Sequence, residues 1–98
     1  MMDKLVYSNG QKTYEFEGQT LKYYYKNGSL KAQGLHIEGK MEGTWHFYRD
    51  NGQLAQIGEF KENMKHGKWI RYDKQGKIDY HEVFEYNIKT TKKDTSLN

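Results

Sequence analysis

Apolar and polar residues alternate with a period of two along most of this chain. Residues 44–48 and 54–60 show the alternation most clearly, with an aromatic or aliphatic residue at nearly every second position and turn-forming residues at each end. This pattern is typical of β-strands with one buried face. Because no segment has apolar residues at helical spacing, we predict an all-β chain.

The pattern also repeats at an interval of 24 residues. Residues of the same type recur at this spacing in four sets: Gly28, Gly52 and Gly76; Tyr24, Tyr48 and Tyr72; Gly43 and Gly67; Trp45 and Trp69. Two further series extend toward the N-terminus: Val6, Leu30, Leu54 and Ile78; Gly10, Gly34 and Gly58. A fixed period indicates stacked copies of one small building block. Four copies fill a predicted repeat domain over residues 1–88.

Two kinds of turn separate the predicted strands. Asn27-Gly28 and Asn51-Gly52 favour two-residue hairpin loops that need positive φ angles, and Gln75-Gly76 is a weaker copy. Longer polar turns at 38–43 and 62–67 join the other strand ends. These turns predict an antiparallel sheet of hairpin repeats with about seven strands. Since no second layer follows in sequence, we expect an elongated sheet that curls about its aromatic face.

A two-residue loop at Asn51-Gly52 places Trp45 opposite Gly58, and the preceding hairpin places Leu21 opposite Gly34. We expect the Trp45 indole to cover the bare backbone of Gly58, so that Gly58→Val crowds Trp45. The same register predicts one core face: Leu21, Tyr23, Leu30, Trp45, Phe47, Leu54, Phe60, Trp69, Ile78, Tyr80 and Phe84.

Composition and charge narrow the functional classes. Aromatic residues make up 15% of the chain and cysteine is absent, so thiolate chemistry and disulfides are excluded and we expect a cytoplasmic protein. The formal net charge is +3, but the segment 89–98 carries +2 of it and is predicted to be a disordered basic tail. The rest of the chain is nearly neutral with interspersed signs, which argues against nucleic acid as a partner.

The residues that could carry chemistry match no catalytic, cofactor or metal-binding pattern. The four histidines, at 36, 46, 66 and 81, fall at unrelated places within the repeat, and no serine lies in a nucleophile motif. Glu15 and Glu17 are interpreted as exposed strand positions. We therefore expect no catalytic, cofactor-binding or metal-binding residues and predict that the protein is not an enzyme.

The repeated polar aromatic residues are the candidates for partner binding. Tyr24, Tyr48 and Tyr72, one per repeat, form either a recognition surface or a stacking ladder that stabilises the sheet. Arg49 and Arg71, which lie 22 residues apart, either pair with acidic groups of a partner or with the nearby Asp50 and Asp73, respectively. These five tyrosines and arginines are the predicted binding residues.

The segment 52–72, which runs Gly-Gln-Leu-Ala-Gln-Ile-Gly-Glu-Phe-Lys-Glu-Asn-Met-Lys-His-Gly-Lys-Trp-Ile-Arg-Tyr, resembles the variant MORN repeat of bacterial YwqK-type antitoxins. The resemblance covers roughly residues 20–80, with His36 in the place of Phe60 and Gly39 in that of Asn63 in the preceding copy. It implies a protein-binding module, an antitoxin or immunity protein that occludes a toxin. The alternatives are a scaffold on anionic membrane lipid and a self-associating structural repeat protein.

Overall fold

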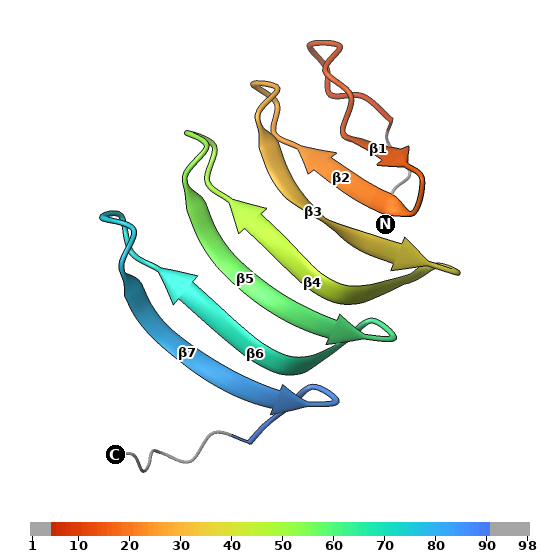
Figure 1. The fold of residues 1–98 in the computed structure, drawn as a ribbon. Coiled ribbons are helices and arrows are strands. Elements are labelled where there is room, and N and C mark those ends of the chain that lie inside the picture. The colour runs from red at the N-terminus through yellow and green to blue at the C-terminus, as the bar shows by residue number, and fades with distance from the viewer. Residues whose placement is uncertain (1–4, 91–98) are drawn as a thin grey trace.

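The structure is a computed structural model and describes residues 5–90, which form a single antiparallel sheet of eight strands in sequence order (Figure 1). The strands are β1 (Tyr14–Glu17), β2 (Thr20–Tyr24), β3 (Leu30–Ile37), β4 (Lys40–Tyr48), β5 (Leu54–Lys61), β6 (Met64–Tyr72), β7 (Ile78–Glu85) and β8 (Ile88–Lys89). The all-β prediction is confirmed. The sheet has one strand more than expected because the two residues of β8 pair with the end of β7.

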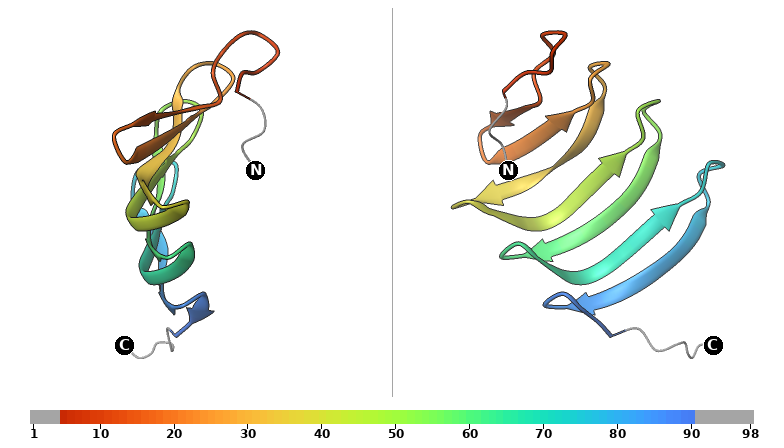
Figure 2. Two further views of the ribbon diagram at one scale, coloured as in Figure 1. Left: turned by 90° about the vertical axis from the view of Figure 1, so that its right-hand side faces the viewer. Right: turned by 180° about the vertical axis from the view of Figure 1, so that it is seen from behind.

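The sheet is one layer deep and strongly bent. Seen from the side, the hairpins stack in a row and no second layer covers them within the described residues (Figure 2). The molecule measures 49 × 34 × 19 Å, which confirms the elongated, curled shape. A single layer has no opposing sheet to pack against, so every buried side chain must be covered by neighbours on the same sheet.

The tight turns contain three loop residues, and the predicted two-residue loops are wrong. In the turn after β4, Gly52 N–H donates to the Arg49 carbonyl at 2.9 Å, and Arg49 N–H donates to the Gln53 carbonyl at 2.8 Å. Gly52 has a φ of 91°, but Asn51 is not among the residues with positive φ. A turn of this kind needs left-handed backbone only at the glycine, whereas the predicted loop needs it at both positions.

The first tight turn lies closer to the second than the 24-residue period predicts. Gly10, with a φ of 91°, closes a turn of the same kind by donating to the Tyr7 carbonyl at 2.9 Å. Gly10 is therefore equivalent to the turn glycine Gly28, only 18 residues later, and not to Gly34 and Gly58 as predicted. The first unit is shorter because β1 and β2 are short strands.

A β-bulge in each of β3, β5 and β7 compensates for the extra loop residue. Phe47 pairs with Gln56 and Tyr48 with Leu54, so Ala55 is the inserted residue. The bulge restores the predicted pairing of Trp45 with Gly58, but it moves Leu54 opposite Tyr48 and away from the core face. Leu30 and Ile78 are shifted in the same way, opposite Tyr24 and Tyr72. The predicted core face is wrong at these three positions, and Ile78 is 61% exposed.

The tryptophans lie over the glycines of the preceding strand, which corrects the predicted partner. Gln33 pairs with His46 and Leu35 with Glu42, so β4 contains two extra residues opposite Gly34. This bulge lets the Trp45 indole lie where a Cβ on Gly34 would be 2.3 Å from its ring, and the indole N–H donates to the Leu35 carbonyl at 2.9 Å.

The second copy repeats this arrangement. A Cβ on Gly58 would meet the Trp69 ring at 2.4 Å, and the Trp69 indole donates to the Glu59 carbonyl at 3.0 Å. Gly58→Val therefore crowds Trp69 and not Trp45. Leu21, which occupies the tryptophan position of the first unit, pairs with Gly34 as predicted and is fully buried.

Hydrogen bonds from side chains connect each hairpin to the next along both edges of the stack. At the tight turns, the Tyr25 hydroxyl donates to the Tyr48 carbonyl at 2.6 Å, and the Asn27 amide donates to the Asp50 carbonyl at 3.1 Å. At the longer turns, Asn63 exchanges two hydrogen bonds with the Met41 backbone, at 2.9 and 3.0 Å. These bonds hold successive turns at one spacing, which the aligned turns of Figure 1 show.

The C-terminal end of the described chain still belongs to the sheet. Lys89 pairs with Phe84 in β8, its ammonium contacts the Glu82 carboxylate at 3.1 Å, and Thr90 N–H donates to the Val83 carbonyl at 2.8 Å. The prediction of a disordered tail over 89–98 is therefore wrong for Lys89 and Thr90, which are hydrogen-bonded to β7. The remainder of the predicted disordered tail, residues 91–98, lies outside the described residues.

Candidate functional site

One face of the sheet carries both tryptophans and all four phenylalanines, and we call it the aromatic face. Strand alternation and register place these residues on it: Tyr14, Phe16, Leu21, Tyr23, Ala32, Trp45, Phe47, Phe60, Trp69, Tyr80 and Phe84. Ring contacts run along and across the strands, with centroid distances of 6.3 Å from Trp45 to Phe47 within β4 and 5.8 Å from Phe47 to Trp69 on β6. Edge-on Phe60 fills the space between the two indoles.

Only a narrow strip of this face is removed from solvent by the sheet itself. Trp45 is fully buried and Trp69 is 7% exposed, because neighbouring rings and the facing glycines enclose the indoles. The outer rings remain accessible, with Phe16 48% and Tyr80 39% exposed. Contiguous exposed aromatic area is a feature of interaction surfaces. The aromatic face is therefore the candidate binding surface.

A cavity of about 260 Å³ opens on the aromatic face near its N-terminal end. Tyr23, Lys31, Ala32 and Phe47 line it. Ala32 pairs with Tyr23 on one side and Phe47 on the other, so a methyl group stands between two rings and leaves space above it. In the next repeat the longer Gln56 occupies the position of Ala32 and pairs with Phe47 and Arg71.

Cationic side chains lie on the rings of this face. The Lys65 ammonium is 4.5 Å from the Trp69 ring centre and 4.8 Å from that of Phe84. Lys31, at the cavity, lies 5.5 Å from the Tyr25 ring centre. The Arg71 guanidinium stacks on Tyr80 at 4.1 Å. The aliphatic carbons and the charged groups of these side chains pack on the rings, which keeps positive charge beside the apolar surface.

The three predicted binding tyrosines lie on the opposite face, away from the cavity. Tyr24, Tyr48 and Tyr72 alternate with the core residues of their strands, so their side chains point away from the aromatic face. Each sits opposite an aliphatic residue next to the bulge. The structure thus groups the tyrosines with Leu30, Leu54 and Ile78 and does not bring them together with the aromatic rings.

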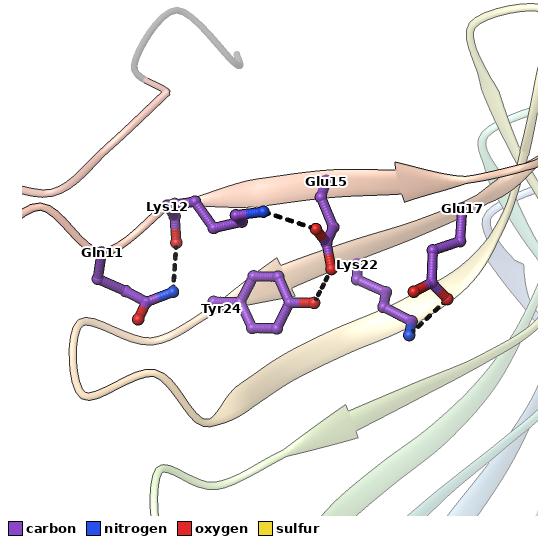
Figure 3. Close-up of polar contacts among 6 residues, drawn as sticks. All are labelled: Gln11, Lys12, Glu15, Glu17, Lys22 and Tyr24. Carbon is purple, nitrogen blue, oxygen red and sulfur yellow. Dashed lines mark hydrogen bonds and ion pairs between the residues drawn. The ribbon is translucent and has the colours of Figure 1, made fainter.

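Tyr24 differs from the other two tyrosines because its hydroxyl donates a hydrogen bond to the Glu15 carboxylate (Figure 3). This bond, together with burial, raises the pKa of Tyr24 to about 12. Hydrogen bonds from Lys12, at 2.8 Å, and from Tyr24 lower the pKa of Glu15. A hydrogen bond from the neighbouring Lys22 ammonium to Glu17 raises the pKa of Lys22. The cluster joins β1 to β2 at the surface.

The two predicted binding arginines are both engaged within the chain, but not by the aspartates proposed as their partners. Arg49 is half-buried, and its guanidinium donates to the Tyr72 carbonyl at 2.8 Å, so it bridges two tight turns in place of the Asp50 contact. Arg71 is exposed and pairs with Asp79 at 3.0 Å rather than with Asp73. Asp79 is the bulge residue of β7, and the bulge directs its carboxylate toward Arg71.

Sequence reasoning missed the cavity residues Lys31 and Ala32 and the ring-capping Lys65. Lys31 is the inserted residue of the β3 bulge, and the bulge is not visible in an alternation pattern that assumes two-residue loops. Lys65 occupies the position of Met41, which packs against the core one unit earlier. The replacement of Met41 by Lys65 one repeat later was the sequence signal for this cation, because it places a lysine at a position that faces the core in the preceding repeat.

Within residues 5–90, no group of three or more histidine, aspartate or glutamate side chains is arranged to hold a metal ion. The same residues include no helix long and apolar enough to cross a membrane.

Comparison with known proteins gives one match. A family model described as the MORN repeat variant matches residues 20–37, 41–62 and 65–86, which together make up more than half of the chain. Each matched segment contains one of the tight turns, at Gly28, Gly52 or Gly76, and the second and third segments contain Trp45 and Trp69. Neither the curated proteins nor the solved structures contain a match to the chain.

Proposed function

Since the chain belongs to the MORN repeat variant family, whose repeats build binding or scaffold proteins, we propose that it is a non-catalytic protein-binding module. More specifically, we propose an antitoxin or immunity protein that covers the active surface of a partner toxin. The resemblance of residues 52–72 to repeats of bacterial antitoxins supports the finer assignment.

The observation that carries the proposal is the exposed aromatic face on a sheet of one layer. Its outer rings, such as Phe16 and Tyr80, are 48% and 39% exposed although aromatic burial is the main stabilising contribution available to this chain. Tyrosine and phenylalanine at a surface contribute large contact area at a low cost in side-chain entropy. Occlusion by such a surface needs shape and charge complementarity and no reacting group, so the proposal requires no catalytic residue.

The proposal is tested with the product of the gene adjacent to that of this chain. The neighbouring protein is expressed in bacteria alone and together with the full 98-residue chain. We expect growth arrest by the neighbour alone, rescue on co-expression, and a complex of fixed stoichiometry in light scattering coupled to size exclusion. The absence of a complex between the purified proteins would refute the antitoxin assignment.

Two variants with the same charge change on opposite faces test whether rescue depends on binding through the aromatic face. Phe47→Asp places a charge on the aromatic face next to the cavity, whereas Gln33→Asp places the same charge on β3 but on the opposite face. We expect Phe47→Asp to lose rescue and complex formation, and Gln33→Asp to retain both. Backbone circular dichroism of each variant shows whether the sheet is intact.

A further inference from the structure

The cavity on the aromatic face has the size of one side chain. Its volume is about 260 Å³, below the roughly 300–1,000 Å³ of pockets that enclose small-molecule ligands. Two half-buried rings, Tyr23 and Phe47, flank it, and Ala32 between them is 5% exposed. Interfaces concentrate their binding energy where a large apolar side chain of one partner fills such a pocket on the other.

The uncompensated charge beside this cavity is positive. Lys31 lines the cavity, is exposed, and contacts the Tyr25 ring and no carboxylate within residues 5–90. At the C-terminal end of the aromatic face, Arg71 pairs with Asp79 and Lys89 with Glu82, whereas the Lys65 ammonium lies over the Trp69 and Phe84 rings. A partner that approaches the cavity therefore meets apolar rings together with one free ammonium group.

We propose that this cavity is the anchor point for an acidic segment of the partner protein, an inference that rests on the binding function proposed above. A large apolar side chain of the segment fills the space between Tyr23 and Phe47 over Ala32. A carboxylate next to that side chain pairs with the Lys31 ammonium. The cavity supplies affinity through apolar burial, and Lys31 selects the sign of the partner's charge.

The distribution of charge favours an acidic protein segment over an anionic membrane. Attraction to such a membrane amounts to about 1 kcal/mol per lysine or arginine near its surface, so stable binding needs a cluster of cations. The aromatic face instead carries two separate ammonium groups without a carboxylate partner among residues 5–90, Lys31 at the cavity and Lys65 over Trp69, together with the carboxylates of Asp79 and Glu82 at its C-terminal end. One cation beside a pocket matches a single side-chain anchor, where each group has a defined counterpart.

The site is tested by titrating the full isotope-labelled chain with two blocked tripeptides and following backbone amide resonances. The probes are Asp-Trp-Asp and Lys-Trp-Lys, both acetylated and amidated. We expect the acidic peptide to shift the amides of residues 31–32 and 47, with an affinity about five-fold above that of the basic peptide, as an exposed ion pair provides. Equal shifts with both peptides, shifts confined to the opposite face, or no shifts would overturn the proposal.

Variants with matched charge changes show whether Lys31 causes the preference for the acidic peptide. Lys31→Glu should reverse the peptide preference, whereas Lys68→Glu, an exposed lysine on the opposite face of β6, should leave it unchanged. Ala32→Leu fills the cavity without changing charge and should abolish binding of both peptides. If these variants unfold, their amide spectra collapse, and the wild-type preference between the two peptides still decides the question.

Further measurements distinguish this inference from the proposed function and from other occupants. If the neighbouring protein forms its complex equally well with wild type, Lys31→Glu and Ala32→Leu, the inference fails and the binding function stands. Binding to vesicles of phosphatidylcholine with phosphatidylserine that depends on Lys31 would replace the protein segment by lipid. Concentration-dependent dimers that Ala32→Leu abolishes would replace it by a second copy of the chain.

Discussion

At the scale of single residues, the stability of this sheet depends on glycines that lie beneath tryptophan rings. Gly34 and Gly58 have ordinary backbone angles, so their role is to leave space rather than to adopt an unusual conformation. Each indole fills that space and donates its N–H to the carbonyl of the residue after the glycine. The tryptophan thus satisfies its one polar atom and buries its ring in the same contact.

Gly58→Ala is expected to destabilise the protein by about 1–3 kcal/mol, because the added Cβ lies 2.4 Å from the Trp69 ring and forces it to move. Urea unfolding followed by circular dichroism measures this cost. The cost should fall in a Trp69→Leu background and persist in a Trp45→Leu background, since only Trp69 covers Gly58. An equal cost in both backgrounds would contradict the assigned ring contact.

The hydrogen bond between Tyr24 and Glu15 predicts a pH dependence at alkaline pH. The pKa of Tyr24 is raised to about 12 from an ordinary value of 10.0, so the folded state favours the protonated phenol. Its contribution to stability is present below pH 10 and is lost as the pH rises toward 12. Tyr24→Phe should remove this loss and the last phenolate transition in an ultraviolet titration.

The neighbouring unit offers a control for this prediction. In that unit Gln33 occupies the position of Glu15, so Tyr48 has no carboxylate at the corresponding place. Tyr48→Phe should therefore leave the alkaline stability curve and the last phenolate transition unchanged. Loss of the same transition in both variants would mean that Glu15 does not hold the Tyr24 proton.

At the scale of elements, the hairpins are connected through the turns as well as through strand pairing. The longer turn between β5 and β6 contains Asn63 with a φ of 72°, and its side-chain oxygen accepts the Met41 N–H. Asn87 repeats both features one unit later, with a φ of 72° and a bond from Lys65 N–H at 2.8 Å. Asparagine suits this place because it tolerates left-handed backbone and carries an acceptor.

Asn63→Ala is expected to cost about 1–3 kcal/mol, since it removes a hydrogen bond between hairpins and places alanine in a left-handed conformation. Asn63→Gly relieves only the backbone strain and Asn63→Asp keeps the acceptor oxygen, so both should cost less. Thermal unfolding of the three variants separates the two contributions. If alanine and glycine were equally destabilising, the backbone conformation would contribute nothing.

At the scale of the whole molecule, the aromatic strip makes the array one cooperative structure. Ring contacts run from Tyr23 through Trp45, Phe47 and Trp69 to Phe84 without a break. The core lies between hairpins rather than inside each one, so no hairpin can bury its own rings alone. The loss of one hairpin therefore exposes the rings of the next.

We expect a single unfolding transition. Trp69→Phe leaves Trp45 as the fluorescent probe of the N-terminal half, and Trp45→Phe leaves Trp69 as the probe of the C-terminal half. In each variant, the denaturant midpoint from fluorescence should coincide with that from backbone circular dichroism. A fluorescence midpoint that differs from the backbone midpoint in either variant would show that the halves unfold separately.

Local sequence patterns are sufficient to predict the element type, the antiparallel order, the pairing of Trp45 with Gly58, and the aromatic residues of the core. Alternation, turn residues and the 24-residue period are local signals, and each depends only on neighbours along the chain. Tertiary structure decided which ring covers which glycine, which side of the sheet Leu54 occupies, and where the cavity opens. The reason is that bulges insert residues into one strand of a pair, so the facing side chains change without any change in the repeat itself.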